Sequence, residues 1–162
     1  MLVEYEINNQ AAVDYAAKWA YIRNPAFYDF SEIGGDCTSF VSQCLYAGGA
    51  VMNYTPDTGW YYSSPMDRAP AWSGVEFFYR FITNNRSVGP FGEVVPAQEA
   101  KVGDVLQLGN GERFYHSLLV VERRDGETYI AAHSYDAFFR PLSSYEYEDV
   151  RCLHILGARR WE

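Results

Sequence analysis

The periodicity of apolar residues changes near residue 94, and this change most constrains the fold. Before it, apolar residues recur at helical spacing in stretches that end at Asn24-Pro25, Gly48-Gly49 and Asn84-Asn85. After it, short stretches with strand periodicity are separated by turn residues such as Asp125-Gly126. Helices followed by successive strands predict an α+β domain, in which N-terminal helices pack on a C-terminal antiparallel sheet.

The expected elements follow from these patterns. We expect helices over about residues 9–22, from Cys37 to Gly48, and over 74–83, and strands over 105–108, 116–122, 128–135 and 150–157. Ser73 and Glu76 match a capping box at the start of the third helix. Residues 50–71 contain four prolines and glycines in all, which predicts a long loop. With Trp60 inside it, this loop is interpreted either as an aromatic wall of a cleft or as a surface loop packed on itself.

Composition sets the class of protein. The chain has 162 residues, 48% of them hydrophobic and 21% charged, which predicts one globular domain over residues 1–162. A formal charge of −8 argues against nucleic acid as a partner. No apolar stretch is long enough to span a bilayer, and the N-terminus lacks the features of a signal peptide. The chain is therefore expected to be cytoplasmic or a domain cut from a longer exported protein, and its oligomeric state cannot be inferred.

Cys37 is the strongest candidate for chemistry. Gly34-Gly35 allow a sharp turn, Asp36 is a favoured N-cap residue, and Cys37 then begins a helix. Unpaired backbone N–H groups and the helix dipole favour a thiolate there, and such surroundings can lower a thiol pKa from ~8.5 to roughly 3.5–7.5. The alternative is that Cys37 is a small buried apolar residue. Cys44 and Cys152 are interpreted as structural thiols, and the spacing of the cysteines and histidines supports no metal site.

A thiolate nucleophile needs a nearby imidazole, and the chain has three histidines. His154 is expected to be structural, whereas His116 and His133 fall on two strands of one hairpin. If Asp125-Gly126 is a two-residue turn, His116 and His133 share a sheet face as diagonal neighbours. A three-residue turn would instead place Ser134 beside His116, because a slip of one residue exchanges the two faces of a strand. His116 is the candidate base, and His133 is the candidate orienting group on the condition that the turn has two residues.

The chain resembles the bacterial putative amidase domain family. That family is related to the papain-like superfamily, which includes cell-wall endopeptidases and cysteine- and histidine-dependent amidohydrolase (CHAP) domains. The matching stretches are Ala11–Ala16 with Trp19, Asn24-Pro25, Gly34–Leu45, Trp72-Ser73, Val102–Val105, His116-Ser117 and the region of His133.

The resemblance implies a papain-like fold in which the cysteine helix packs on a sheet that supplies the histidine. It also implies that Cys37 is the nucleophile, His116 the general base and His133 the orienting group, without a cofactor. In the endopeptidases an Asp-Cys-Ser motif helps to hold the free amine of the substrate. Here Asp36 matches the motif and is a candidate for substrate binding, but Thr38 stands in place of the serine.

Three functions are compatible with these residues. The first is a cysteine amidase or peptidase that acts on an amide- or peptide-containing substrate, with cell-wall material as one candidate. Tyr28 and Trp60 would then help to shape its pocket. The second is an inactive module of the same fold that binds a peptide or glycan. The third is acyl transfer to an amine other than water. No membrane partner is expected.

Overall fold

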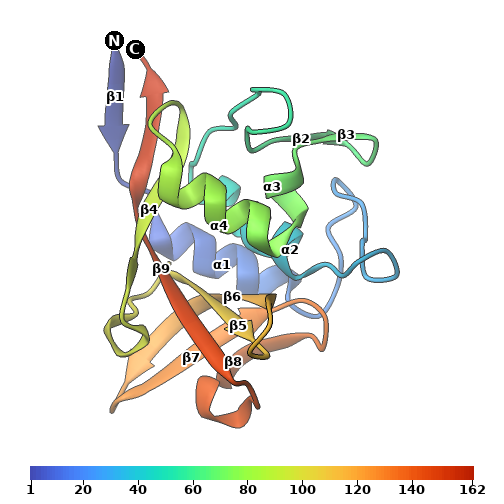
Figure 1. The fold of residues 1–162 in the computed structure, drawn as a ribbon, viewed down its shortest axis with the longest axis vertical. Helices are drawn as coiled ribbons and strands as arrows, with labels where there is room; N and C mark the ends of the chain where they lie inside the picture. Colours follow the sequence, from blue (N-terminus) through green and yellow to red (C-terminus); the bar gives the residue numbers. More distant parts are fainter.

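The computed structural model describes all 162 residues, and it confirms the predicted α+β architecture (Figure 1). The helices α1, α2 and α4 form a layer on one side of a curved antiparallel sheet. The helical segments are α1 (Asn9–Trp19), α2 (Cys37–Ala47), α3 (Pro70–Ser73), α4 (Val75–Asn84) and the short 3₁₀ turns Ala97–Glu99 and Leu142–Ser144. The strands are β1 (Leu2–Tyr5), β2 (Tyr62–Ser64), β3 (Asp67–Arg68), β4 (Gly89–Val95), β5 (Val105–Gly109), β6 (Phe114–Arg124), β7 (Glu127–Ala132), β8 (Ala137–Pro141) and β9 (Asp149–Trp161).

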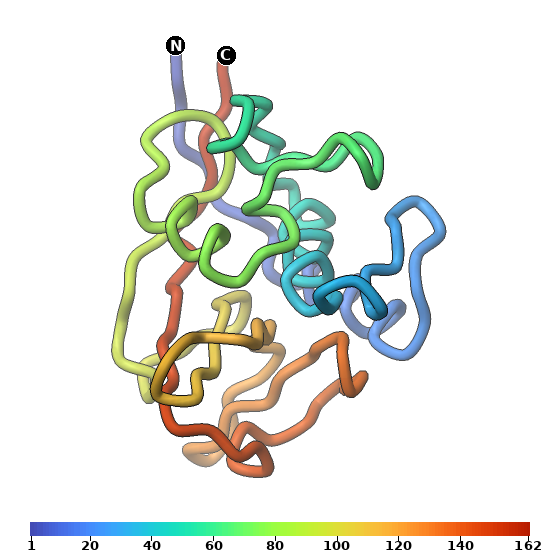
Figure 2. Tube along the Cα trace, turned by 45° about the vertical axis from the view of Figure 1, so that its right-hand side comes forward, coloured from blue at the N-terminus to red at the C-terminus, as the bar shows by residue number.

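The long strand β9 pairs with three other strands of the main sheet, β1, β4 and β5. The sheet has seven strands in the order β1-β9-β5-β6-β7-β8, with β4 paired to the other edge of β9. The C-terminal part of β9 pairs with β1, so the two chain termini lie side by side (Figure 2). All of these pairings are antiparallel, as the sequence predicted, although β1, β4 and β8 were not expected as strands.

Two hydrophobic clusters lie on the two faces of the sheet. The larger one fills the space between helices and sheet and includes Phe40 and Leu45 of α2 with Leu119 of β6. The smaller one covers the opposite face and includes Leu118 and Val120 of β6. Alternate residues of β6 therefore face the helices and the opposite cluster in turn. This alternation decides which residues of β6 can meet the start of α2 from the helix side.

The pairing of β6 with β7 contains one extra residue. At the Asp125-Gly126 turn Arg124 pairs with Glu127, as predicted, but the register shifts by one between Val120 and Glu122. Beyond that bulge Leu119 pairs with Ala131, so the ladder no longer follows the regular hairpin. A slip of one residue exchanges the two faces of a strand. The prediction that His116 and His133 share a face is therefore wrong.

Local capping also differs from the prediction at α4. Ser73 ends α3, and Gly74 rather than Ser73 is the N-cap residue of α4, without a side-chain cap. The Ser73 hydroxyl accepts a hydrogen bond from Arg68, and Glu76 forms an ion pair with Arg151. The capping-box motif was present in the sequence, but tertiary contacts take both of its side chains.

The predicted loop at 50–71 is more ordered than expected, because it contains the β2–β3 hairpin and the start of α3. Trp60 anchors it in the core between helices and sheet, where the ring is fully buried. Its indole N–H donates to the Ser42 hydroxyl, which in turn donates to the carbonyl of Trp72, both at 2.9 Å. Ser42 thereby ties the loop and α3 to α2.

No helix in the structure combines the length and apolar character needed to cross a membrane.

Replacing Ser42 by alanine leaves the indole N–H of Trp60 and the carbonyl of Trp72 without this partner in the core. We expect Ser42→Ala to lower the free energy of unfolding by about 1–3 kcal/mol, measured by urea denaturation. Ser63→Ala is the matched control, because Ser63 is exposed on β2 and should change stability by less than about 0.5 kcal/mol. Equal effects of the two variants would contradict the role given to Ser42.

Candidate functional site

The chain turns sharply before Cys37, as predicted. Gly34 and Gly35 both have positive φ, at 81° and 95°, a conformation that glycine adopts without strain. α2 then begins at Cys37 with Asp36 in the N-cap position. The Asp36 carboxylate makes no cap hydrogen bond with α2, which corrects the expectation that its side chain caps this helix. That carboxylate is engaged elsewhere.

The Cys37 thiol is buried beside the start of β6. Backbone N–H groups of Cys37, Thr38 and Ser117 act on its sulfur and lower its pKa, but burial has the larger effect and raises the thiol pKa above its ordinary value. The predicted lowering is therefore wrong for the resting protein. Because the β6–β7 ladder ends at the pair of Leu119 and Ala131, Ser117 lies beyond it. The sulfur thus lies next to a stretch of β6 that β7 does not cover.

Hydrogen-bonded side chains connect the first turn of α2 to β6. The Thr38 and Ser117 hydroxyls lie 2.9 Å apart, and Sγ of Cys37 lies 3.8 Å from the Thr38 hydroxyl. Ser117 also accepts from Nε2 of Gln107 on β5, at 3.1 Å. All of these side chains are buried. They fix the start of α2 on the sheet, and they show that Ser117 rather than its neighbour His116 points to the helix side.

His116 points toward the opposite cluster. Its ring lies 6.1 Å, centroid to centroid, from Tyr145, which packs against that cluster. Neither ring nitrogen makes a hydrogen bond within the chain, although the residue is only 8% exposed. Burial, and secondarily the charge of Arg140, lower the His116 pKa to about 4. His116 is thus a neutral imidazole near pH 7, with its nitrogens free for a proton transfer.

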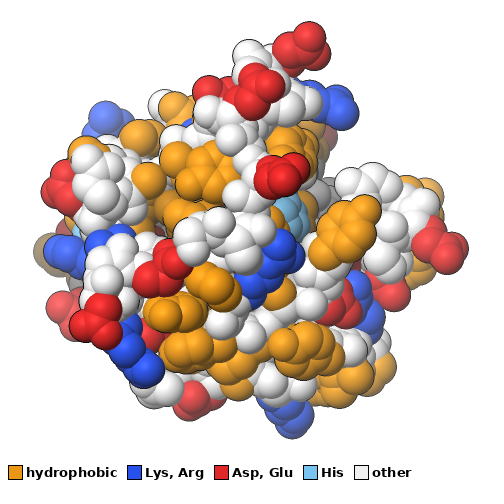
Figure 3. Space-filling view, turned by 90° about the horizontal axis from the view of Figure 1, so that it is seen from below, with side chains coloured by type: hydrophobic (Ala, Val, Ile, Leu, Met, Phe, Trp, Pro, Cys, Tyr) orange, Lys and Arg blue, Asp and Glu red, His pale blue; other side chains and the backbone are white.

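The face of the molecule below the sheet is partly open. Figure 3 shows it with histidine atoms reaching the surface in a hollow, between a basic and a hydrophobic side chain. Arg140 of β8 lies over the ring of Tyr145, with its guanidinium carbon 3.7 Å from the ring centroid. The hydroxyl of Tyr145 is buried without a hydrogen-bond partner. His116, Tyr145 and Arg140 therefore form a group of contacts distinct from those on the helix side.

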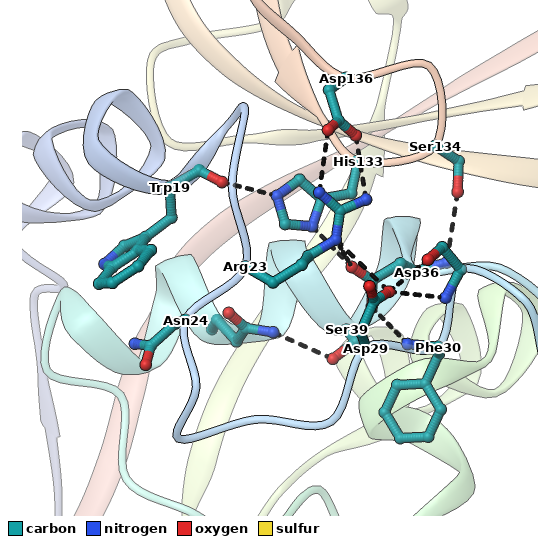
Figure 4. A network of polar contacts seen from close by, with 12 residues as sticks. Trp19, Arg23, Asn24, Asp29, Phe30, Asp36, Ser39, His133, Ser134 and Asp136 are labelled. Atoms are coloured by element: carbon teal, nitrogen blue, oxygen red, sulfur yellow. Dashed lines mark hydrogen bonds and ion pairs between the residues drawn. The ribbon is translucent and has the colours of Figure 1, made fainter.

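Asp36 lies at the centre of a network of charged and polar groups, of which Asp36 and His133 are buried and Arg23 and Asp136 are partly exposed (Figure 4). One carboxylate oxygen accepts from Nδ1 of His133 at 2.7 Å and lies 2.8 Å from Nε of Arg23, in an ion pair whose angle is poor for a hydrogen bond. The other accepts from the backbone N–H of Phe30 at 3.3 Å. Arg23 also makes a two-point contact with Asp136, at 2.9 and 3.1 Å.

The position of His133 differs from its predicted use. Its ring stacks on Phe40 of α2, with centroids 3.9 Å apart, and its second nitrogen lies 2.7 Å from the carbonyl oxygen of Trp19. That carbonyl can only accept, so this nitrogen carries a proton. The Asp36 carboxylate, when ionised, also only accepts. Both ring nitrogens therefore have partners within the protein, and neither is free for His116.

Of the three residues expected to bind substrate, two are inaccessible. Asp36 is 1% exposed with both oxygens engaged, and Trp60 is fully buried. The interpretation of residues 50–71 as a cleft wall therefore does not hold at Trp60. Tyr28 is 41% exposed, and its ring contacts that of Phe30 edge-on at 5.0 Å. Tyr28 alone of the three stays a candidate for contact with a ligand.

Sequence reasoning missed the residues that complete the network. Arg23 and Asp136 lie 113 positions apart, and no local pattern marks them as partners. Ser117 was noted only as part of the His116-Ser117 motif. Its proximity to Cys37 depends on the bulge in β6, which has no sequence signal because Val121 only extends the apolar run that begins at Leu118. No group of three or more His, Cys, Asp and Glu side chains is arranged to hold a metal.

The two histidines should differ in what they contribute to stability. Replacing His133 by alanine removes a partner from the buried Asp36 carboxylate and a stacking partner from Phe40. We expect His133→Ala to lower the free energy of unfolding by at least about 3 kcal/mol in urea denaturation. His116→Ala is the matched comparison, because the His116 ring has no hydrogen bond to lose, and its effect should be clearly smaller. The reverse order would contradict the structural role of His133.

Acid should destabilise the protein in part through His116. Its pKa of about 4 in the folded protein lies below its ordinary value of 6.5. The unfolded chain therefore binds more protons between these pH values, and stability is lost as the pH falls through that window. We expect wild type to lose about 3 kcal/mol more than His116→Gln between pH 7 and pH 4, from urea unfolding at each pH. Parallel curves for the two proteins would contradict the lowered pKa.

Comparison with known proteins places the chain in a family. The model of the family described as "Putative amidase domain" matches residues 6–156. A curated relative, described as "Uncharacterized protein YhbB" of Bacillus subtilis (strain 168), is 33% identical over 151 residues, which cover 90% of this chain and 46% of that protein. The chain thus spans about half the length of this relative. No solved structure matches it. The chain belongs to the putative amidase domain family.

Proposed function

We propose that the protein is a cysteine amidase or peptidase, with Cys37 as nucleophile and His116 as general base. The observation that carries this proposal is the position of Cys37. It is the first residue of α2, its sulfur faces the backbone N–H groups of Cys37, Thr38 and Ser117, and Ser117 directly follows His116. Membership of a family of putative amidases supports the same class of reaction.

The resting pair is neutral. Burial raises the Cys37 pKa and lowers the His116 pKa to about 4, so at pH 7 the thiol holds its proton and the imidazole is free to accept it. For this transfer the His116 ring must turn from its contact with Tyr145 toward the edge of β6 beside Cys37, which β7 leaves uncovered. There it takes the thiol proton as Sγ of Cys37 attacks the carbonyl carbon of the bound amide. Backbone N–H groups at the start of α2 then stabilise the oxyanion.

The remaining steps follow from the same groups. The His116 imidazolium gives its proton to the nitrogen of the leaving amine as the C–N bond breaks, which leaves a thioester on Cys37. His116 then accepts a proton from water as the water oxygen attacks the thioester, and it returns that proton to the sulfur as the acid leaves. An amine in place of water would give acyl transfer by the same steps.

Asp36 and His133 act as positioning residues in this proposal. Their contact holds the N-cap of α2 against the end of β7, directly beside Cys37. In the resting protein the His116 ring lies beside the ring of Tyr145, on the sheet face opposite the helices. This assignment replaces the expected role of His133 as the group that orients the base.

The substrate is an amide- or peptide-containing molecule. The case for a substrate held by its free amine on Asp36 is weak, because both oxygens of Asp36 have partners within the protein. Cell-wall peptides are therefore one candidate among peptides, without specific support from this residue. The alternative function is an inactive module that binds a peptide or glycan.

The decisive experiment is hydrolysis of a library of peptides and N-acyl amides by wild type and by Cys37→Ala. We expect Cys37→Ala to abolish turnover while the protein stays folded, as judged by its thermal unfolding. Ligand binding without hydrolysis in either protein would support the binding module. Hydrolysis retained by Cys37→Ala would reject the proposal.

The pH dependence of kcat/KM tests the base. His116 must be neutral to accept the thiol proton, and its pKa is about 4, so activity should fall on the acid side with a midpoint near that value. Arg140→Gln removes the cation that lowers this pKa, and its acid midpoint should lie at higher pH than that of wild type. An acid midpoint in wild type near the ordinary histidine pKa, unchanged by Arg140→Gln, would exclude His116 as the general base.

A further inference from the structure

The turn between β7 and β8 is strained. Its central residues, Ser134 and Tyr135, both have positive φ, at 65° and 60°. Two successive residues of this kind occur in type I′ turns, where Asn-Gly is strongly preferred. A serine followed by a bulky tyrosine is unfavourable in this conformation, because Cβ approaches the backbone carbonyl oxygen. Contacts elsewhere must therefore hold the turn in this shape.

Those contacts come from the residues around Cys37. The Ser134 hydroxyl accepts from the backbone N–H of Asp36 at 3.3 Å, one residue before Cys37 (Figure 4). Asp136, at the far side of the turn, binds Arg23 at two points, and His133, at the near side, binds Asp36. Figure 2 shows the turn lying beside the loop that leads to α2. Contacts with Asp36 and Arg23 therefore hold the strained turn on both of its sides.

The Tyr135 side chain of this turn packs little against the rest of the protein. Tyr135 is 89% exposed, the most exposed of the aromatic residues, so no packing explains the strain at its backbone. Tyr21, Ile22 and Ile33 are also each more than half exposed. The Tyr21 hydroxyl accepts from the backbone N–H of Phe138 on β8, and Ile33 lies three residues after Phe30, whose N–H donates to Asp36. Exposed apolar side chains therefore occur on these segments although the chain as a whole is acidic.

We propose that Tyr135 is a substrate-contacting residue, whose ring gives an apolar surface to the amino acid side chain that flanks the amide attacked by Cys37. Strain in a turn is retained where the surrounding structure fixes it, and it concentrates at ligand-binding sites. This inference rests on the proposed function, since it requires Cys37 to react with the bound amide. It adds a preference for aromatic or aliphatic over acidic side chains next to that amide.

Covalent labelling of Cys37 tests this inference without turnover. The probes are N-acyl-aminoacyl chloromethyl ketones whose residue is Phe, Leu, Ala or Asp. The sulfur of Cys37 displaces chloride from the methylene carbon, its proton passes to the solvent, and mass spectrometry identifies the labelled residue. Rates are divided by the rate with iodoacetamide, which carries no side chain, so that changes in thiol reactivity cancel.

We expect the Phe probe to label wild type at least about tenfold faster than the Ala probe, with the Asp probe slowest. Tyr135→Gly should remove this preference and leave the iodoacetamide rate unchanged. It should also raise the Tm by about 2–4 °C, because glycine adopts positive φ without strain. Asp125→Gly is the matched control, since Asp125 has a φ of 53° in the turn at the other end of β7. It should keep the wild-type preference.

Equal rates for all four probes in wild type, or a Phe preference that survives in Tyr135→Gly, would overturn the inference. A lower Tm in Tyr135→Gly would show that the turn is not strained, and would remove the basis of the inference. These outcomes differ from a failure of the proposed function, which is hydrolysis retained by Cys37→Ala. Labelling and hydrolysis therefore decide the two proposals separately.

Discussion

The contact between Asp36 and His133 is the interaction on which the site depends. It joins residues 97 positions apart, with both side chains only 1% exposed, and it lies between the start of α2 and the end of β7. A buried ion pair contributes little net stability compared with apolar residues of the same shape, whereas breaking it leaves an uncompensated buried group. We therefore interpret this contact as one that fixes the position of α2 against the sheet, and with it the position of Cys37.

Burial controls the chemistry of both candidate catalytic groups. At Cys37 the backbone N–H groups favour the thiolate, but loss of solvent outweighs them and raises the pKa. At His116 the same loss of solvent, together with Arg140, favours the neutral ring. The two effects give a thiol and an imidazole, each in the form that a proton transfer from sulfur to nitrogen needs. A helix N-terminus thus promotes a thiolate only to the extent that solvent or a substrate compensates for burial.

The sequence allowed the fold to be predicted where local rules decide it. The start of α2 follows from Gly34-Gly35 and the helical pattern after Cys37, and the turn at Asp125-Gly126 follows from its residue types. The pairing beyond that turn could not be predicted, because a bulge at Val121 exchanges the faces of His116 and His133 without a change in the apolar pattern. Turn chemistry fixes the first pairs of a hairpin, and packing on α2 fixes the later ones.

The same limit of local sequence rules explains which parts of the candidate site could be predicted. The nucleophile could be found from local features, whereas the partners of Asp36 come from segments that are distant in sequence. These partners also explain how the turn at Ser134 and Tyr135 keeps its unfavourable backbone. Its neighbours His133 and Asp136 are bound to Asp36 and Arg23, so relaxing the turn would disrupt one buried and one partly buried contact. The network that places Cys37 on the sheet therefore also holds the exposed ring of Tyr135 at its rim, and one set of contacts determines both positions.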